Sequence, residues 1–588
     1  MAWALAAWEV YCVTGERSWL RTAYDIIRRS AEADLLTAYD SETGLFRGES
    51  SFLDWRDQSY PRWMDPKDIY QSQALGTNAI HYATYRILAE MARSLGEPSE
   101  RYDTVADSVR QGMNKYLWQA THGFYGQYRY GRNYQSLSPR AEGLGEALSM
   151  IYGVTTTEQR ERLARQMPVV PFGVPSFWPY IPNMPPYHNA GIWPQVVGFW
   201  TWASAEAGNA AGVEHGLASI YRAAALFLTN KENMVASTGH FEGTELNSDR
   251  LIGSVAGNLA AVYRVFFGIR ARPDRLVFEP FIPRSYSGER TLRDLRYRDA
   301  RLTVTVRGFG SAPARILLDG QPVGRAEIPA TLAGVHTLEI VMNGKLRKAA
   351  IDIAENRYTP ETPRAVLEGD RLVWERVPGA AAYTVSRNGC PISTTSRTHA
   401  RVVRRDGIDE YQVLALDARG FESFLSEPVR VAPSESVRIV QAERDRPETE
   451  AGGFTGSGYV SLTTGRNTTV NLPVEVSVAG VYSIDVRYAN GSGPVNSSDK
   501  AAVRTLLVDG RRRGGVVMPQ RGTDLWNDWG YSNPLRVRLA AGKHTLMITY
   551  TESDQNMNRT VNTALLDHVR LTRLALEGAR ARPRRCLK

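Results

Sequence analysis

The stretch IHYATYRILAEMARSL, residues 80–95, decides the fold class of the first part of the chain. Its apolar residues recur at steps of three and four, at Ile80, Ala83, Ile87, Met91 and Leu95. Residues 255–269 repeat the pattern. Because this spacing places one apolar stripe along a helix, it predicts core-facing helices from residue 1 to about residue 270.

After Gly268 the pattern changes to short runs that alternate between apolar and polar residues. RLTVTV at 301–306 is one such run, and the Asp319-Gly320 turn dipeptide ends another. A period of two with Asp-Gly turns is typical of antiparallel strands. The sequence therefore predicts three β-sandwich domains, at 271–355, 356–434 and 435–575, and a basic disordered tail at 576–588.

The charge and the hydrophobicity of the chain argue against two classes of protein. The 588 residues carry a net charge of +9, but Arg511–Arg513 and the tail from Arg580 to Lys588 hold most of that excess. A nucleic-acid-binding face needs basic residues clustered on a folded surface, so we expect no nucleic-acid partner. No stretch approaches the roughly 20 apolar residues that span a bilayer, so we expect no membrane span.

The segment GESSFLDWRDQSYPRWMD, residues 48–65, mixes aromatic, acidic and basic side chains. Aromatic faces bind the apolar faces of sugar rings, while carboxylates and guanidinium groups bind the hydroxyls, so the mixture indicates a glycan pocket. The alternative is structural, with Asp57 and Arg62 as an ion pair that pins a long loop and the tryptophans as packing residues.

A second segment, residues 236–269, places Glu242 and Glu245 just before an apolar helix. Hydrolysis of a glycosidic bond normally needs two carboxyl groups, so either glutamate is a candidate for the second one. Both could instead favour the dipole at the helix N-terminus. We favour Glu242, because it lies nearer the expected loop tip and residues 247–249 are expected to cap the helix.

Residues 1–270 resemble the (α/α)6-barrel, or six-hairpin, glycosidases, a clan that includes trehalases, mannosylglycerate hydrolases and α-L-rhamnosidases. The clan's acid lies in a motif of the form Glu-Ser-x-Trp-Asp-x-Ser followed by Arg and an aromatic residue. The residues that match it, with insertions, are Glu49, Ser50, Trp55, Asp57, Ser59, Arg62 and Trp63. The resemblance implies Asp57 as the catalytic acid, with Asp54 as its rival.

The same resemblance implies a substrate pocket and a second carboxylate. The substrate-binding residues would be Trp55, Arg56, Arg62 and Trp63, together with His188 and Trp193 of the clan-like segment PYHNAGIWP at 186–194. His188 could equally be a hydrogen-bonded structural residue. The clan's base lies shortly before the last barrel helix, where Glu242 and Glu245 stand. Since the acid loop begins only about 50 residues into the chain, we expect the barrel to be truncated at its N-terminus.

The β region carries two further resemblances. Residues 356–434, with Trp374, Tyr383 and Tyr411, resemble a fibronectin type III domain. The pieces RIVQAERD, VAGVYSIDVRYANGSG, LAAGKHTLMITY and LLDHVRL occur in the order of a family 35 carbohydrate-binding module. That module implies Ca2+ held by Glu443 and Asp567, and sugar contacts from Asn490, Trp526, Trp529 and Asn556. The carboxylates could instead be ordinary surface groups, and the aromatics could be core residues.

Together these features predict a glycoside hydrolase that acts on an oligo- or polysaccharide. The clan implies inversion and exo-action on an α-linked or rhamnosyl-type glycan, with no catalytic cofactor. The appended modules favour a secreted, periplasmic or cell-surface location. The alternative is a non-catalytic glycan-binding protein that has kept the barrel shape.

Overall fold

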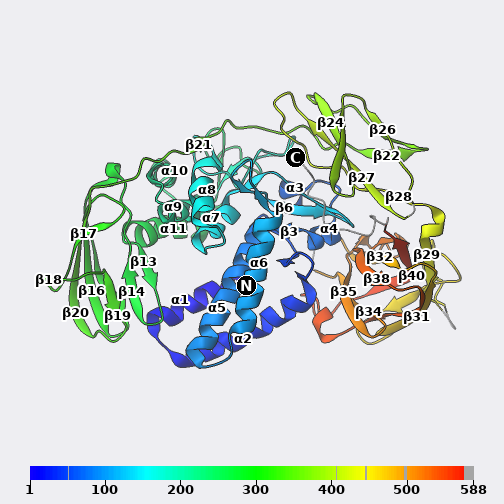
Figure 1. Cartoon of the computed structure of the whole chain (residues 1–588), viewed down its shortest axis with the longest axis horizontal. Helices are drawn as coiled ribbons and strands as arrows, with labels where there is room; N and C mark the ends of the chain where they lie inside the picture. The colour runs from blue at the N-terminus through cyan, green and yellow to red at the C-terminus, as the bar shows by residue number, and fades with distance from the viewer. Residues whose placement is uncertain (51, 406, 444–446, 495–498, 575–588) are drawn as a thin grey trace.

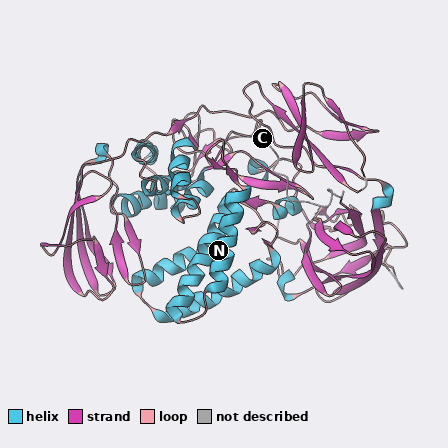
Figure 2. Ribbon diagram, in the orientation of Figure 1, coloured by secondary structure: helices cyan, strands magenta, loops and turns pink. Residues whose placement is uncertain are grey.

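The computed structural model describes residues 1–574 except 51, 406, 444–446 and 495–498. Helices fill the N-terminal part, and sheets fill the part after residue 268, as the sequence predicted (Figures 1 and 2). The helical region lies in the middle of the molecule, with sheets on both sides of it (Figure 1). The predicted tail at 576–588 falls outside the described residues.

The longer helices of this region pack against one another through buried faces. They are α1 (Ala2–Thr14), α2 (Arg17–Thr37), α5 (Leu75–Leu95), α6 (Glu100–Tyr116), α7 (Gly143–Ile151), α8 (Thr157–Gln166), α9 (Pro194–Glu206), α10 (Ala210–Phe227) and α11 (Ile252–Ala260). In α5 the quoted stripe buries Ala83 and Met91, and the helix ends at Gly96, whose φ of 75° suits a left-handed cap. None of the helices in the described part of the chain combines the length and apolar character that crossing a bilayer requires.

The predicted N-terminal cap of the last α-helix, α11, is wrong. Leu251 is the N-cap of α11, and no side chain caps this helix, so residues 247–249 do not play that role. Asn247 instead donates from Nδ2 to the backbone oxygen of Asn233 at 2.8 Å. Its amide therefore ties the loop before α11 to the segment that precedes strand β12 (Met234–Val235).

The first sheets continue the hydrophobic core of the helices. A three-stranded sheet has the order β13-β14-β19, and a five-stranded sheet has the order β15-β16-β20-β17-β18. Their strands are β13 (Ile269–Ala271), β14 (Arg275–Phe278), β15 (Gly288–Tyr297), β16 (Ala300–Gly308), β17 (Pro313–Leu318), β18 (Gln321–Pro322), β19 (Glu327–Pro329) and β20 (Gly334–Met342). One buried cluster extends in sequence from Ala4 to Met342, so these sheets are packed onto the helical region.

Two further groups of sheets have cores of their own. Residues 365–431 form a three-stranded sheet, β22 (Ala365–Glu368), β23 (Arg371–Trp374) and β26 (His399–Arg401), and a four-stranded sheet, β25 (Cys390–Thr395), β24 (Ala382–Arg387), β27 (Asp409–Leu416) and β28 (Val429–Val431). Trp374 and Tyr383 lie in their shared core. Residues 437–573 form a six-stranded and a four-stranded sheet around a separate core that includes Tyr488 and Leu506.

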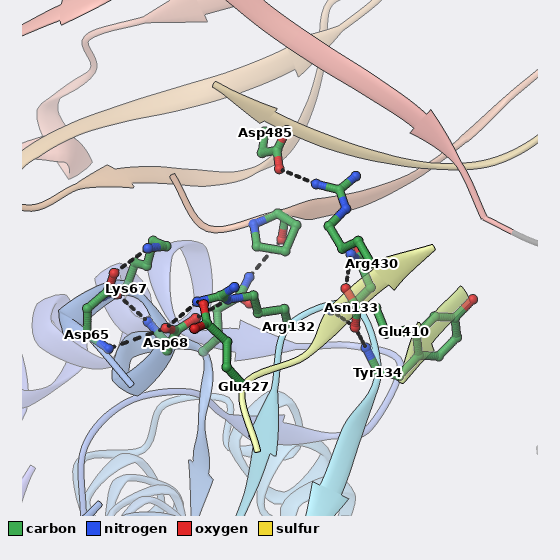
Figure 3. Close-up of polar contacts among 12 residues, drawn as sticks. Asp65, Lys67, Asp68, Arg132, Asn133, Tyr134, Glu410, Glu427, Arg430 and Asp485 are labelled. Carbon is green, nitrogen blue, oxygen red and sulfur yellow. Dashed lines mark hydrogen bonds and ion pairs between the residues drawn. The ribbon is translucent and has the colours of Figure 1, made fainter. Parts of the chain in front are cut away.

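A polar junction joins these two groups to the helical region (Figure 3). Arg132 reaches Asp68 at 3.0 Å and Glu427 at 2.8 Å. Its neighbour Asn133 donates to Glu410 at 2.7 Å, and Asn133 O accepts from Arg536 at 3.3 Å. Contacts from all three parts therefore meet at residues 132 and 133, and they fix the later sheets against the loops of the helical region.

Candidate functional site

Five rings form a cluster where two loops of the helical region meet. Phe52 and Trp55 belong to the first loop, and Tyr187, His188 and Trp193 belong to the second. Trp55 lies 5.2 Å from Tyr187 between ring centroids, and His188 stacks on Trp193 at 5.2 Å. Phe52 packs edge-on against both His188 and Trp193. The cluster brings the segment at 48–65 and the segment at 186–194 together.

His188 orients the carboxylate of Asp54. The imidazole is buried, and its Nε2 lies 3.0 Å from Oδ1 of Asp54, whose side chain is 80% exposed. Because an ionised carboxylate only accepts hydrogen bonds, Nε2 carries the proton and donates it. This hydrogen bond lowers the pKa of Asp54, so the group is ionised at neutral pH.

Glu49 carries a second carboxyl on the same loop. Its environment raises its pKa, whereas the pKa of Asp54 is lowered. Desolvation by surrounding protein, followed by the negative charge of Asp54, raises the pKa of Glu49 to about 7. Its side chain nevertheless remains accessible to water. Glu49 is thus crowded by protein on one side and reached by solvent on the other. Glu49 can therefore carry a transferable proton near neutral pH.

Glu232 is a third carboxyl, which the sequence interpretation missed. It precedes β12, and β12 pairs with β11 (Gly191–Ile192), so the pairing brings Glu232 beside the second loop. Tyr187 Oη donates to Glu232 Oε1 at 3.0 Å. Burial raises the pKa of Tyr187, and the charges of Glu232 and Asp54 add to that rise. Tyr187 thus lies close enough to both carboxylates for their charges to raise its pKa.

The predicted bases, Glu242 and Glu245, have different surroundings. The Glu242 side chain is 78% exposed, and its backbone N–H donates to His240. Glu245 is also exposed, although its backbone N–H donates to Pro186 O at 2.8 Å, next to Tyr187. Among the described residues, no hydrogen bond or ion pair joins either side chain to the ring cluster. In sequence, Glu232 stands ten positions before Glu242, outside the segment from which the candidates were drawn.

The remaining residues of the first loop face elsewhere. Asp57, Arg62 and Trp63 line a separate cavity of about 420 Å³. Trp63 Nε1 donates to Leu425 O at 2.8 Å, and Arg56 donates to Met64 O at 2.6 Å and Arg62 O at 2.9 Å. No ion pair between Asp57 and Arg62 occurs in the described part of the chain. The structure therefore separates Asp54 and Trp55 from the other predicted residues of this loop.

In the C-terminal sheets, the predicted sugar-binding residues divide into two kinds. Trp526 lines a hollow of about 320 Å³ beside Tyr459 and Glu450, whereas Trp529 donates from Nε1 to Gly452 O at 2.8 Å. The side-chain amide of Asn490 is buried and donates to two backbone oxygens, and Asn556 does the same. These two amides shape loops, while Trp526 is half-buried and lines the hollow.

The predicted calcium ligands lie around one loop. Ser457 donates to Glu443 Oε1, and Thr455 donates to both oxygens of Asp567, which also pairs with Arg487. Glu443 Oε2 is buried and has no hydrogen-bond partner among the described residues, which suits an oxygen that binds a hard cation. No cluster of three acidic, histidine or cysteine ligands occurs among the described residues. An ion here would therefore need carbonyl, hydroxyl or water oxygens to complete its shell.

An aromatic cluster with three carboxyl groups beside it, on loops that connect helices, is typical of glycan-active proteins. In agreement, residues 2–243 match the model of the mannosylglycerate hydrolase MGH1-like glycoside hydrolase domain. The helical region thus matches a glycoside hydrolase domain of the six-hairpin type, in agreement with the resemblance of its motifs.

Curated relatives match only part of the chain. A cycloisomaltooligosaccharide glucanotransferase of Niallia circulans is 32% identical over 123 residues, which is 21% of this chain and 11% of that protein. An exo-β-D-glucosaminidase of Amycolatopsis orientalis is 31% identical over 133 residues, 23% of this chain and 12% of that protein. The chain spans about a tenth of the length of these relatives.

Solved structures that resemble the chain include a family 35 carbohydrate-binding module and a sialidase. The module, from Cellvibrio japonicus Abf62, is 18% identical, covers 24% of this chain and 95% of its own, and has a TM-score of 0.19. The sialidase is 15% identical, covers 55% of this chain and 32% of its own, and has a TM-score of 0.44.

Proposed function

We propose that this protein hydrolyses glycosidic bonds, with the carboxyl pair Glu49–Asp54 as the proton source and Glu232 as the base. The main support is the position of Tyr187. Its hydroxyl donates a hydrogen bond to Glu232, and the charge of Asp54 contributes to its raised pKa. Carboxyl groups therefore gather around one aromatic wall, inside the segment that matches a glycoside hydrolase domain.

Each carboxyl has a role that fits its environment. Glu49, whose pKa is about 7, gives its proton to the glycosidic oxygen as the bond to the anomeric carbon breaks. Glu232 removes a proton from the water that attacks the anomeric carbon from the other face, which gives inversion. After release of the sugar, Glu49 is left ionised and Glu232 protonated, and solvent exchange restores both groups.

Asp54 and His188 act as positioning residues in this scheme. The hydrogen bond from His188 keeps Asp54 ionised, and the negative charge of Asp54 helps to keep the proton on Glu49. Near neutral pH the proton therefore resides on Glu49, while Asp54 stays ionised. The faces of Trp55 and Trp193 offer surfaces for the apolar side of a sugar ring.

The wider setting of the proposal follows the sequence interpretation. The substrate is an α-linked or rhamnosyl-type oligo- or polysaccharide, attacked from one end, and the protein works outside the cytoplasm. The sheets at 365–431 are a fibronectin type III-like unit, and those at 437–573 are a calcium-stabilised carbohydrate-binding unit in which Trp526 contacts the sugar. The helices belong to a barrel of the (α/α)6 type.

The test is incubation of the full chain with a panel of aryl glycosides and polysaccharides, with the released sugars identified. Release of a monosaccharide from one class of α-glycoside is the expected result. If no substrate is cleaved while the protein still binds glycans, the alternative of a non-catalytic glycan-binding protein is correct.

A further inference from the structure

The cavity of about 420 Å³ lies between the helical region and the segment that leads into the sheets at 365–431. Asp57, Arg62, Trp63 and Met184 line it from the helical side. Residues 359–366 form the facing wall, and Phe424 lies between the two sides. The cavity therefore depends on parts of the chain that are far apart in sequence.

The cavity and the ring cluster share the same two loops. Asp54 and Trp55 belong to the cluster, and Asp57 lines the cavity only three residues after Asp54, so their Cα atoms lie within about 11 Å of each other. Buried Gln58 locks the loops together, since it donates to Pro185 O at 3.0 Å and accepts from the Asn189 N–H at 3.1 Å. The ring cluster and the cavity are therefore neighbours on the same pair of loops.

The facing wall is held in place before any ligand arrives. The backbone N–H of Thr359 donates to Tyr180 O at 3.0 Å, and its hydroxyl accepts from Arg140 at 3.1 Å. On the other side of the cavity, Glu427 pairs with Arg132 in the junction (Figure 3). A preformed wall avoids the cost of ordering a loop when a ligand binds.

The lining has the chemistry of a sugar site. Asp57, Arg62 and Arg364 make no side-chain hydrogen bond or ion pair in the described part of the chain, so their polar groups are free to bind hydroxyls. Trp63 and Phe424 supply the apolar surface. Because acidic and basic groups are mixed, the lining suits an uncharged, hydroxyl-rich ligand.

We propose that this cavity binds the leaving-group side of an oligosaccharide whose terminal residue occupies the ring cluster. The inference rests on the proposed function and narrows it, because it makes an oligosaccharide a better substrate than a simple glycoside. Contacts between the oligosaccharide and the cavity then help to hold the scissile bond beside Glu49 and Glu232.

The test compares an oligosaccharide with the aryl glycoside of the same terminal sugar. Val366, which lines the cavity and is 54% exposed, becomes Trp to fill the space, and Arg364 becomes Ala to remove a hydroxyl ligand. Arg371→Ala, on the next strand and outside the lining, is the matched control. We expect kcat/KM for the oligosaccharide to fall about tenfold in both cavity variants, with a smaller loss for the aryl glycoside, whose single ring contacts less of the cavity, and with the control unchanged.

Equal losses on both substrates, or none on either, would overturn the proposal. A binding titration separates this result from failure of the proposed function, because it needs no turnover. The oligosaccharide is titrated into the full chain carrying Trp526→Ala, with and without Val366→Trp. Weaker binding in the doubly substituted protein supports binding of the oligosaccharide in the cavity, even if nothing is hydrolysed. Equal binding refutes it, even if hydrolysis occurs.

Discussion

Replacing Asp54 by Asn should shift the pH dependence of turnover to lower pH. Glu49 must be protonated to act as the acid, so activity of the wild type should fall as the pH rises through about 7. The pKa of Glu49 rises from 4.5 to about 7, and desolvation contributes more to this rise than the charge of Asp54 does. Removing that charge can therefore reverse less than half of the rise, which gives a shift of about one pH unit or less.

The assay is kcat/KM for an aryl glycoside measured across the pH range. Asp57→Asn is the matched control, because it removes a carboxyl from the same loop that contributes nothing to the pKa of Glu49. Where turnover of Asp54→Asn is too slow, the titration of Glu49 followed by carbon NMR gives the same information. An alkaline limb that stays at its wild-type position in Asp54→Asn, or moves in the control, would refute the coupling of Glu49 to Asp54.

Three further predictions concern the site, the calcium loop and the junction. Tyr187→Phe should keep the ring packing but lower kcat about tenfold or more, because Glu232 loses a hydrogen bond; unchanged kinetics would contradict this. Ca2+ should raise the melting temperature of the wild type and leave Glu443→Ala unaffected in calorimetry, and an equal response in both would exclude Glu443 as a ligand. Arg132→Met should destabilise the protein by about 3–5 kcal/mol in denaturant unfolding, because Asp68 stays buried without its partner; a loss below about 1 kcal/mol would show that the pair is dispensable.

The sequence predicted the elements and the loops better than the positions of individual carboxyls. Helical and alternating periods are local, so the change near residue 268 and the importance of the two aromatic loops were visible. The resemblance put Asp57 ahead of Asp54, and no local pattern could show that Asp57, in the short helix α3 (Arg56–Ser59), lines the cavity while Asp54 bonds to His188. Glu232 depends on the pairing of β11 with β12, which no local pattern reveals.

Burial also separated residues that look alike in sequence. Asn490 and Trp526 both stand in loops of the C-terminal sheets and were both expected to contact sugar. Whether an amide bonds to neighbouring carbonyls, as Asn490 does, or faces solvent depends on how the loops pack. That packing is set by contacts between distant strands, so composition and spacing could not determine it.

The central claim, that Glu232 is the base of a glycoside hydrolase, is tested most directly by Glu232→Gln with Glu242→Gln as its control. Hydrolysis of a responsive glycan is followed by NMR, which reports both the rate and the anomer first released. The account predicts an inverted anomer from the wild type and from Glu242→Gln, with turnover in Glu232→Gln reduced by about a thousandfold. Turnover of Glu232→Gln near the wild-type rate, together with an inactive Glu242→Gln, would contradict it.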